Sequence, residues 1–236
     1  MLVSNSHDFV FIRVPKAGST SALFYFLKAG LYNQETDVLG LEGHFYCWQQ
    51  LENHFKTHGD NYLTPSNTLR SLAATLKIHR DIHISYDRLV EKGWVREGMP
   101  CFATIRNPFK RMVSSYFYEK KLKEHYGNVF KFNDINEFAL DACLDVPVKT
   151  HSMYHMEQHT YFPNQAKLWN TENLHAHAVA DISALGGTVP EEVSVRKTEG
   201  SSMDYKKLLY PETIKAIELK YAKDFVLWEK AYAVYN

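Results

Sequence analysis

A lysine, a glycine and three hydroxyl side chains stand together between two runs of different character. The run FVFIRV (9–14) is typical of a strand, SALFYFLKA (21–29) is typical of a helix ended by Gly30, and PKAGST lies between them. At such a junction the backbone N–H groups of the helix N-terminus can bind an anion, and a lysine adds a mobile positive charge. The candidate residues of this predicted anion site are Lys16, Ala17, Gly18, Ser19, Thr20 and Ser21. The plainer alternative is an ordinary turn with a surface lysine and an N-cap serine.

A second junction of the same kind follows the run CFATI (101–105). Arg106 stands at the expected strand end, Asn107 is a plausible N-cap, and Pro108 suits the first position of a helix. Ligands gather at the carboxyl ends of strands in open α/β sheets, so Arg106 and Ser114, two turns into that helix, could contact one phosphate. From residue 106 to 123 there are six Lys or Arg and one Glu, which suits an anionic ligand, although a charge run is more often a solvated helix face.

The remaining pattern alternates between the two kinds of element. We expect strands at 76–84 and 174–180, a short helix capped by Ser85, a helix from Pro108 to about Lys123, a helix opened by Asp134, and a last helix from Pro211 to about Trp228. Strands that alternate with helices predict an α/β fold with a parallel sheet and helices on its faces. No repeat or linker divides the chain, so residues 1–236 are predicted to form one domain, with excursions at 31–75 and 125–160.

Composition excludes several classes of function. Lys plus Arg number 27 and Asp plus Glu number 27, so no global charge attracts nucleic acid or an anionic membrane. The three cysteines form no CxxC pair, which favours reduced thiols over a zinc site or a disulfide framework. No apolar run reaches the roughly 18 to 20 residues that span a bilayer, and no signal peptide is recognisable. We therefore expect no membrane span and a cytoplasmic location.

The two junctions together resemble the sulfotransferases. VPKAGSTS is similar to the loop that binds the 5′-phosphosulfate in that family, and IRNPFKRMVSSY is similar to its 3′-phosphate motif R-[DN]-P-x-x-R-x-x-S-x-Y. The resemblance implies a P-loop-like three-layer α/β/α fold with a central parallel sheet. It also implies that the donor is 3′-phosphoadenosine 5′-phosphosulfate (PAPS), that the acceptor is a hydroxyl, and that no metal is needed.

Further segments resemble the carbohydrate branch, in particular the hexuronic-acid 2-O-sulfotransferases. His83-Ile-Ser-Tyr86 is similar to the segment that carries that branch's catalytic base, and Asn164-Gln-Ala-Lys167 is similar to a later segment. The run VRKTE (195–199) resembles the loop that closes over the nucleotide, which implies nucleotide contacts from Arg196, Lys197 and Thr198. Animal relatives generally carry an N-terminal anchor that this chain lacks, which favours a bacterial or viral source or a trimmed chain.

The resemblance assigns roles in sulfuryl transfer to two residues. An imidazole with an ordinary pKa of about 6.5 can take the acceptor's proton near neutral pH, so His83 is the predicted base. Lys16 is predicted to stabilise the charge that develops on the departing phosphate. His79 lies on the same face of the expected strand and is the rival base, and the bland alternative for His83 is a half-buried histidine bonded to a carbonyl.

Other activities compete with this hypothesis. A non-catalytic module could hold a 3′,5′-bisphosphorylated nucleotide, and a nucleotide kinase could use an unusual phosphate loop, although the lysine precedes the glycine and GxxxxGK[ST] is absent. His151, His155 and His159 have the spacing of one helix face and could in principle ligate a metal, although we expect a polar wall near the acceptor. The acceptor could be a polysaccharide, a glycolipid, a small glycoside or a peptide tyrosine, with a carbohydrate favoured.

Overall fold

The computed structural model describes residues 1–33, 36–39, 83–125, 127–145, 155–191, 193 and 203–234. The strands in these ranges are β1 (Leu2–Ser4), β2 (Phe9–Ile12), β3 (Val38–Leu39), β4 (Cys101–Ile105) and β5 (Lys167–Asn170). The α-helices are α1 (Ser19–Lys28), α4 (Tyr86–Glu91), α5 (Pro108–His125), α6 (Ile135–Ala142), α8 (Leu174–Ala184), α9 (Pro211–Lys220) and α10 (Ala222–Tyr232). Three short 3-10 helices are η1 (Gln158–Thr160), η2 (Thr171–Asn173) and η3 (Tyr205–Lys207).

The five described strands form one sheet in the order β3-β1-β2-β4-β5. β2, β4 and β5 pair in parallel, whereas β1 is antiparallel to both β2 and β3. β1 is therefore the one strand of this sheet that runs against the others. β2 and β4 are direct neighbours, paired from Val10 with Cys101 to Ile12 with Ala103. Their carboxyl ends consequently meet at one edge of the sheet, where both predicted junctions begin.

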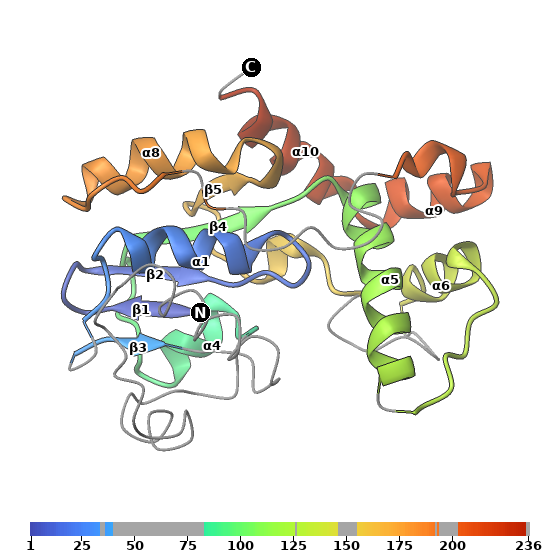
Figure 1. Ribbon diagram of the computed structural model, residues 1–236, viewed down its shortest axis with the longest axis horizontal. Helices are drawn as coiled ribbons and strands as arrows, with labels where there is room; N and C mark the ends of the chain where they lie inside the picture. The colour runs from blue at the N-terminus through green and yellow to red at the C-terminus, as the bar shows by residue number, and fades with distance from the viewer. Residues whose placement is uncertain are drawn as a thin grey trace.

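Helices cover both faces of the sheet, which makes the architecture a three-layer α/β/α fold (Figure 1). On one face α1 and α8 pack on Phe9, Phe11, Phe102 and Trp169, and the ring of Phe26 from α1 stacks on Trp169 with centroids 4.7 Å apart. On the other face α4 and α10 pack on alternate residues of the same strands. The expected α/β fold with a central, mostly parallel sheet is confirmed.

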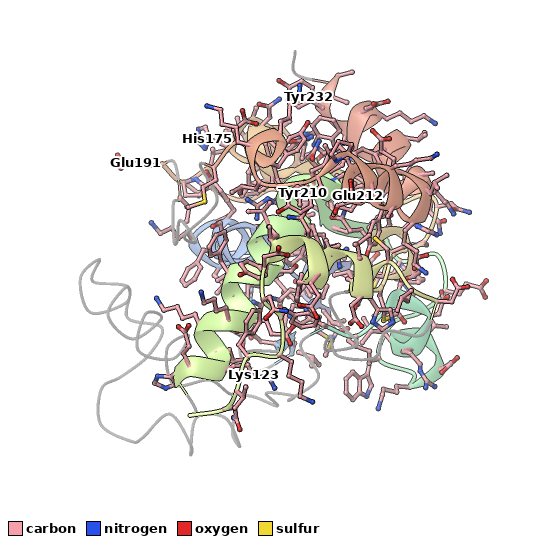
Figure 2. All side chains as sticks on the ribbon, turned by 90° about the vertical axis from the view of Figure 1, so that its right-hand side faces the viewer. Lys123, His175, Glu191, Tyr210, Glu212 and Tyr232 are labelled. Carbon is pink, nitrogen blue, oxygen red and sulfur yellow. The ribbon has the colours of Figure 1, made fainter. Side chains whose placement is uncertain are left out.

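A separate apolar cluster joins α5, α6 and α9 beyond the sheet (Figure 1). Figure 2, which faces this group, shows Lys123 near the far end of α5. α5 has 18 residues and is therefore about 27 Å long. The basic run from 106 to 123 is divided by this length: Arg106 and Arg111 are buried near its start, and Lys120 and Lys121 are exposed near its end. The run therefore does not form a single anion site.

Several element predictions are confirmed. CFATI forms β4, Asn107 accepts at its Oδ1 from the N–H groups of Phe109 and Lys110, and α5 begins at Pro108. Ser85 and Asp134 cap α4 and α6. The first helix begins at Ser19, two residues before the expected start, because Gly18 in a left-handed conformation already turns the chain into it.

Two element predictions are wrong. Residues 174–180 form the first part of helix α8 and not a strand, because Leu174, Ala178 and Ile182 recur at a spacing of four and pack in one core. His175 and His177, which a strand would place on one face, consequently point in different directions on the helix. The last helix is broken at Tyr221 into α9 and α10.

The predicted strand at 76–84 lies outside the described residues except for its end. His83 occupies a turn, and Ile84 is in no regular element. In the part of the chain that the structure describes, none of the helices combines the length and the apolar character that crossing a bilayer requires.

Candidate functional site

The chain leaves β2 through a tight loop formed by residues 15–18. Lys16 has a φ of 60° and Gly18 a φ of 71°, both in the left-handed region. Gly18 is also the N-cap of α1, and no side chain caps this helix. The first amide groups of α1, at Ser19, Thr20 and Ser21, have no intrahelical acceptor by position. The loop and the first turn of α1 therefore concentrate N–H groups at the end of β2.

Three consecutive carbonyl groups of this loop are held by side chains from elsewhere in the fold. Arg111 Nε donates to Pro15 O at 3.0 Å, and Arg106 Nη1 donates to Lys16 O at 3.2 Å. The Thr171 hydroxyl lies 3.0 Å from Ala17 O and 2.9 Å from Ile105 O, and its hydrogen is shared between them. These donors come from α5, from the end of β4 and from η2. We call this arrangement the carbonyl clamp.

The carbonyl clamp determines where the amides of the loop point. In a planar trans peptide the C=O and N–H bonds point in opposite directions. Because the carbonyls of residues 15, 16 and 17 point toward the clamp, the N–H groups of Lys16, Ala17 and Gly18 point away from it. The N–H of Ala17 makes a long 3.4 Å contact with Val14 O. The loop thus turns the N–H groups of Lys16 and Gly18 to the side away from the clamp, an arrangement that suits a phosphate or sulfate group.

Gly18 is required by its surroundings as well as by its φ. A Cβ at this position would lie 2.7 Å from Thr171 Cγ2, closer than real Cβ contacts come. Thr171 therefore touches the loop twice, through its hydroxyl at Ala17 O and through its methyl group at Gly18. The close packing of η2 against the loop leaves no room for any larger residue.

The second junction holds polar side chains that are buried and not fully bonded. Arg106 and Ser114 are 8% and 1% exposed. Among the described residues, Arg106 Nε, Arg111 Nη2 and Ser114 Oγ have no hydrogen-bond partner. Buried donors are ordinarily bonded, so this group of donors next to the carbonyl clamp is suited to an acceptor-rich ligand.

The electrostatics of this junction also favour an anion. Burial lowers the pKa of Arg106 below its ordinary value, the Glu172 carboxylate opposes this shift, and the like charge of Arg111 adds to it. Glu172 is itself bonded to Lys110 Nζ and to the indole N–H of Trp228, each at 3.1 Å. A negatively charged ligand would offset the crowding of two buried guanidinium groups.

The side chain of His83 is hydrogen-bonded to the main chain of Arg13, the first residue after β2. Its Nδ1 lies 2.7 Å from Arg13 O. Because a carbonyl oxygen can only accept, the proton is on Nδ1, and in the neutral ring Nε2 is the nitrogen that can accept a proton. The side chain of Arg13 in turn donates to Thr20 Oγ1 at 3.0 Å. His83, the loop and α1 are thus linked at the same edge of the sheet.

The Lys16 ammonium lies over the ring of Tyr118, with Nζ 3.7 Å from the ring centroid. This is within the range of a favourable cation–π contact. Tyr118 lies nearly three turns into α5, so the contact places the Lys16 ammonium beside the middle of that helix.

A sequence model of the sulfotransferase family matches residues 1–233. The chain belongs to the sulfotransferase family. Among curated proteins and among solved structures, no significant match was found. Membership makes the protein a transferase of sulfuryl groups, and it implies a sulfonate donor and an acceptor substrate.

The structure brings together most of the residues that the sequence singles out in this sulfotransferase. Residues 16–21, Arg106 and His83 are linked by hydrogen bonds or by the chain itself, and Ser114 lies two turns along α5. Arg196, Lys197, Thr198 and the rival base His79 lie outside the described residues.

Sequence reasoning missed three residues of the site. Arg111 is part of the quoted motif, so its spacing was a usable signal, although no role followed from it. Thr171 and Gln158 act across 154 and 52 residues of chain, and neither has a local pattern that reveals its contacts.

The histidine trio is only partly described. His151 lies outside the described residues, and His159 Nδ1 is bonded to the buried carboxylate of Asp224 at 3.0 Å. Within the described ranges, no group of three or more His, Cys, Asp or Glu is placed to hold a metal ion.

Proposed function

We propose that this sulfotransferase moves a sulfuryl group from PAPS to a hydroxyl group of a carbohydrate. The observation that carries the proposal is the loop at residues 15–18, whose carbonyls are bonded inward and whose amides face outward beside Lys16. This geometry suits the 5′-phosphosulfate, and the buried donors of Arg106 and Ser114 suit a second phosphate one strand away.

The reaction is a direct, in-line displacement at sulfur. The acceptor oxygen forms a bond to sulfur, the bond from sulfur to the bridging phosphate oxygen breaks, and 3′-phosphoadenosine 5′-phosphate (PAP) leaves. His83 Nε2 takes the acceptor's proton, since Nδ1 is occupied by Arg13 O. Lys16 and the loop amides stabilise the charge on the departing phosphate.

Arg196, Lys197 and Thr198 are proposed to close over the nucleotide. The sequence resemblance favours the 2-hydroxyl of a hexuronic acid as acceptor.

The first test is thermal unfolding with PAP, with ATP plus Mg²⁺ as the matched control. At about 100 times its dissociation constant, a ligand of the native state adds roughly 2.7 kcal/mol, which is on the order of 5 °C for a chain of this size. Stabilisation by PAP alone supports the donor site. Stabilisation by ATP alone would favour a kinase and would refute the proposal.

The second test separates an enzyme from a nucleotide-binding module. Wild-type protein and His83→Gln are incubated with radiolabelled PAPS and a panel of uronic-acid polysaccharides, neutral glycosides and a tyrosine peptide. We expect transfer to a uronic-acid polysaccharide, and we expect His83→Gln to bind PAP normally while transferring at least about 100-fold more slowly. A wild-type protein that binds PAP but sulfates no acceptor would indicate a non-catalytic module.

A further inference from the structure

Gln158 makes a double hydrogen bond with the main chain of Arg106. The N–H of Arg106 donates to Gln158 Oε1 at 3.0 Å, and Gln158 Nε2 donates to Arg106 O at 2.9 Å. β4 ends at Ile105 and its partner β5 ends at Asn170, so the sheet no longer supplies partners to Arg106. The side-chain amide of Gln158 takes the place of a strand residue at this point. Gln158 itself is completely buried.

Gln158 is held from the opposite side by Asp224 of α10. The N–H of Gln158 donates to Asp224 Oδ2 at 2.7 Å. The other carboxylate oxygen accepts from the N–H and from Nδ1 of His159, each at 3.0 Å. Asp224 is completely buried, and all three of these donors belong to η1. The main chain of Gln158, from which its side-chain amide extends, is therefore held independently of Arg106.

These contacts continue into the candidate donor site. The side chain of Arg106 donates from Nη1 to Lys16 O, one of the three carbonyls of the clamp. A chain of hydrogen bonds thus runs from α10 through Asp224, Gln158 and Arg106 to the loop that faces the anion. A shift in the Arg106 main chain would move the guanidinium and the loop together.

We infer that Gln158 is a positioning residue for the donor nucleotide: by fixing the main chain of Arg106, it sets the direction in which the guanidinium leaves β4. Gln158 does not touch the nucleotide. The inference rests on the proposed function, because it assumes that Arg106 and the loop bind PAPS and PAP. It assigns a role in the site to η1, a segment that the sequence resemblance leaves without one.

The test uses Gln158→Glu in the full chain. This substitution keeps the shape of the side chain and replaces the Nε2 amide donor by a carboxylate oxygen. An ionised carboxylate still accepts from the Arg106 N–H, but its second oxygen faces Arg106 O and repels it. Only the protonated acid can donate to that carbonyl. The groups that surround position 158 are the Arg106 guanidinium, the Asp224 carboxylate and the His159 imidazole; burial and Asp224 favour the protonated acid, and Arg106 opposes it.

We expect the variant to bind PAP about 10-fold more weakly than wild type at pH 8. The ratio of the two dissociation constants, measured by calorimetry, should narrow toward 1 as the pH falls to 5.5, because the acid then restores the lost bond. PAP itself changes protonation over this pH range, but this changes the dissociation constants of both proteins equally and therefore cancels in their ratio. Gln165→Glu is the matched control: it makes the same substitution at an exposed position seven residues away, and its ratio should stay near 1 at every pH.

Gln158→Met keeps the length of the side chain and removes both hydrogen bonds, and it should weaken PAP binding equally at every pH. With PAPS as substrate, the KM for the donor should rise in both variants while kcat at saturating donor stays within about twofold of wild type. Thermal unfolding without nucleotide reports any loss of folding separately.

Two outcomes would overturn the inference, and they are distinguishable. If wild type binds PAP and both folded variants bind it equally well, Gln158 has a structural role only and the proposed function stands. If wild type binds no PAP, the proposed function fails and the inference fails with it.

Discussion

The two strand-to-helix junctions lie side by side at one edge of the sheet and treat their amide groups in opposite ways. After β4, Asn107 accepts from two amides of the first turn of α5, so that helix is capped by its own neighbour in sequence. After β2, no side chain caps α1, and the bonding is done at the carbonyl side of the loop by Arg106, Arg111 and Thr171.

This difference indicates two ways of preparing an anion site. At the first junction the backbone is the proposed binding group, and distant side chains hold it in shape. At the second junction the backbone is already satisfied, so any anion must be bound by side chains such as Arg106 and Ser114. A hydroxyl or amide cap before a helix thus indicates a closed N-terminus, whose first amides are bonded to the cap. A glycine in the same place indicates an open N-terminus, whose amides can bind a ligand.

The largest effect that separates the junctions is expected from Gly18→Ala. An alanine here would have to adopt the left-handed backbone conformation of Gly18, which costs about 1–2 kcal/mol. Its Cβ would also collide with Thr171. We expect PAP affinity, measured by calorimetry, to fall on the order of 100-fold.

Gly30→Ala is the matched control for Gly18→Ala. Gly30 has a φ of 75°, and a Cβ there would meet nothing within 4 Å. This variant should lose similar stability from the backbone alone and bind PAP as wild type does. Equal affinity of the two variants would mean that the loop does not bind the nucleotide.

An effect of similar size is expected from Lys16→Met, on turnover and not on affinity. Removing one preorganised donor from a developing anion typically lowers kcat by about 100-fold or more. We expect kcat to fall by that amount in a steady-state assay with PAPS, and PAP affinity to change less. Lys28→Met, at the C-terminal end of α1 and away from the loop, should leave kcat unchanged. A Lys16→Met enzyme with normal kcat would show that the amides suffice without the ammonium.

Asn107→Ala tests the closed junction. Loss of an N-cap costs about 1 kcal/mol of stability, which urea unfolding would detect. PAP affinity should change by no more than about twofold, because these amides serve the helix and not the ligand. Asp134→Ala removes a cap of the same geometry from α6 and should cost a similar amount. A fall in PAP affinity comparable with that of Gly18→Ala would contradict the distinction between the junctions.

The smallest effect concerns stability at low pH and arises away from both junctions, in α8. Burial lowers the pKa of His177 below its ordinary 6.5, although Asp181 and a hydrogen bond to Ala231 oppose the shift. The His177 imidazole therefore binds a proton more readily in the unfolded chain than in the folded one. The contribution of neutral His177 to the free energy of unfolding is complete above about pH 6.5 and is lost as the pH falls below that value.

Urea unfolding at pH 7.5 and pH 5.5 checks this expectation. The free energy of unfolding should decrease between these conditions by less in His177→Asn than in wild type. His155, whose pKa burial also lowers, accounts for part of the remaining decrease. An identical decrease in both proteins would show that His177 does not contribute.

The sequence predicts the parts of the fold that are specified locally. β4, its Asn-Pro exit and the start of α5 follow from neighbouring residues, and so do the caps at Ser85 and Asp134. β1 is missed because its three residues are too few to show a period, and it is defined by pairing with β2 and β3. The error at 174–180 arises because His and Ala alternate there, and this alternation hides the spacing of four at which the residues of α8 pack in the core.

The candidate site divides in the same way. The proposed anion-binding segment is recognisable because its lysine, glycine and hydroxyl side chains are close together in the chain. The residues that give it its shape are not recognisable, because Thr171 and Gln158 reach it from elements that only the folded sheet brings near. Sequence therefore indicates which residues meet the ligand better than it indicates which residues hold them.

The carbonyl clamp also has a kinetic consequence. Because Arg106, Arg111 and Thr171 order residues 15–17 when the protein folds, the loop has its receptive shape before any nucleotide arrives. Little ordering entropy then remains to be lost in each encounter, so association at this end of the nucleotide is expected to be a single docking step, with a rate set by diffusion and charge. A cycle that releases one nucleotide for every sulfuryl group transferred benefits from a receptor that need not refold between turnovers.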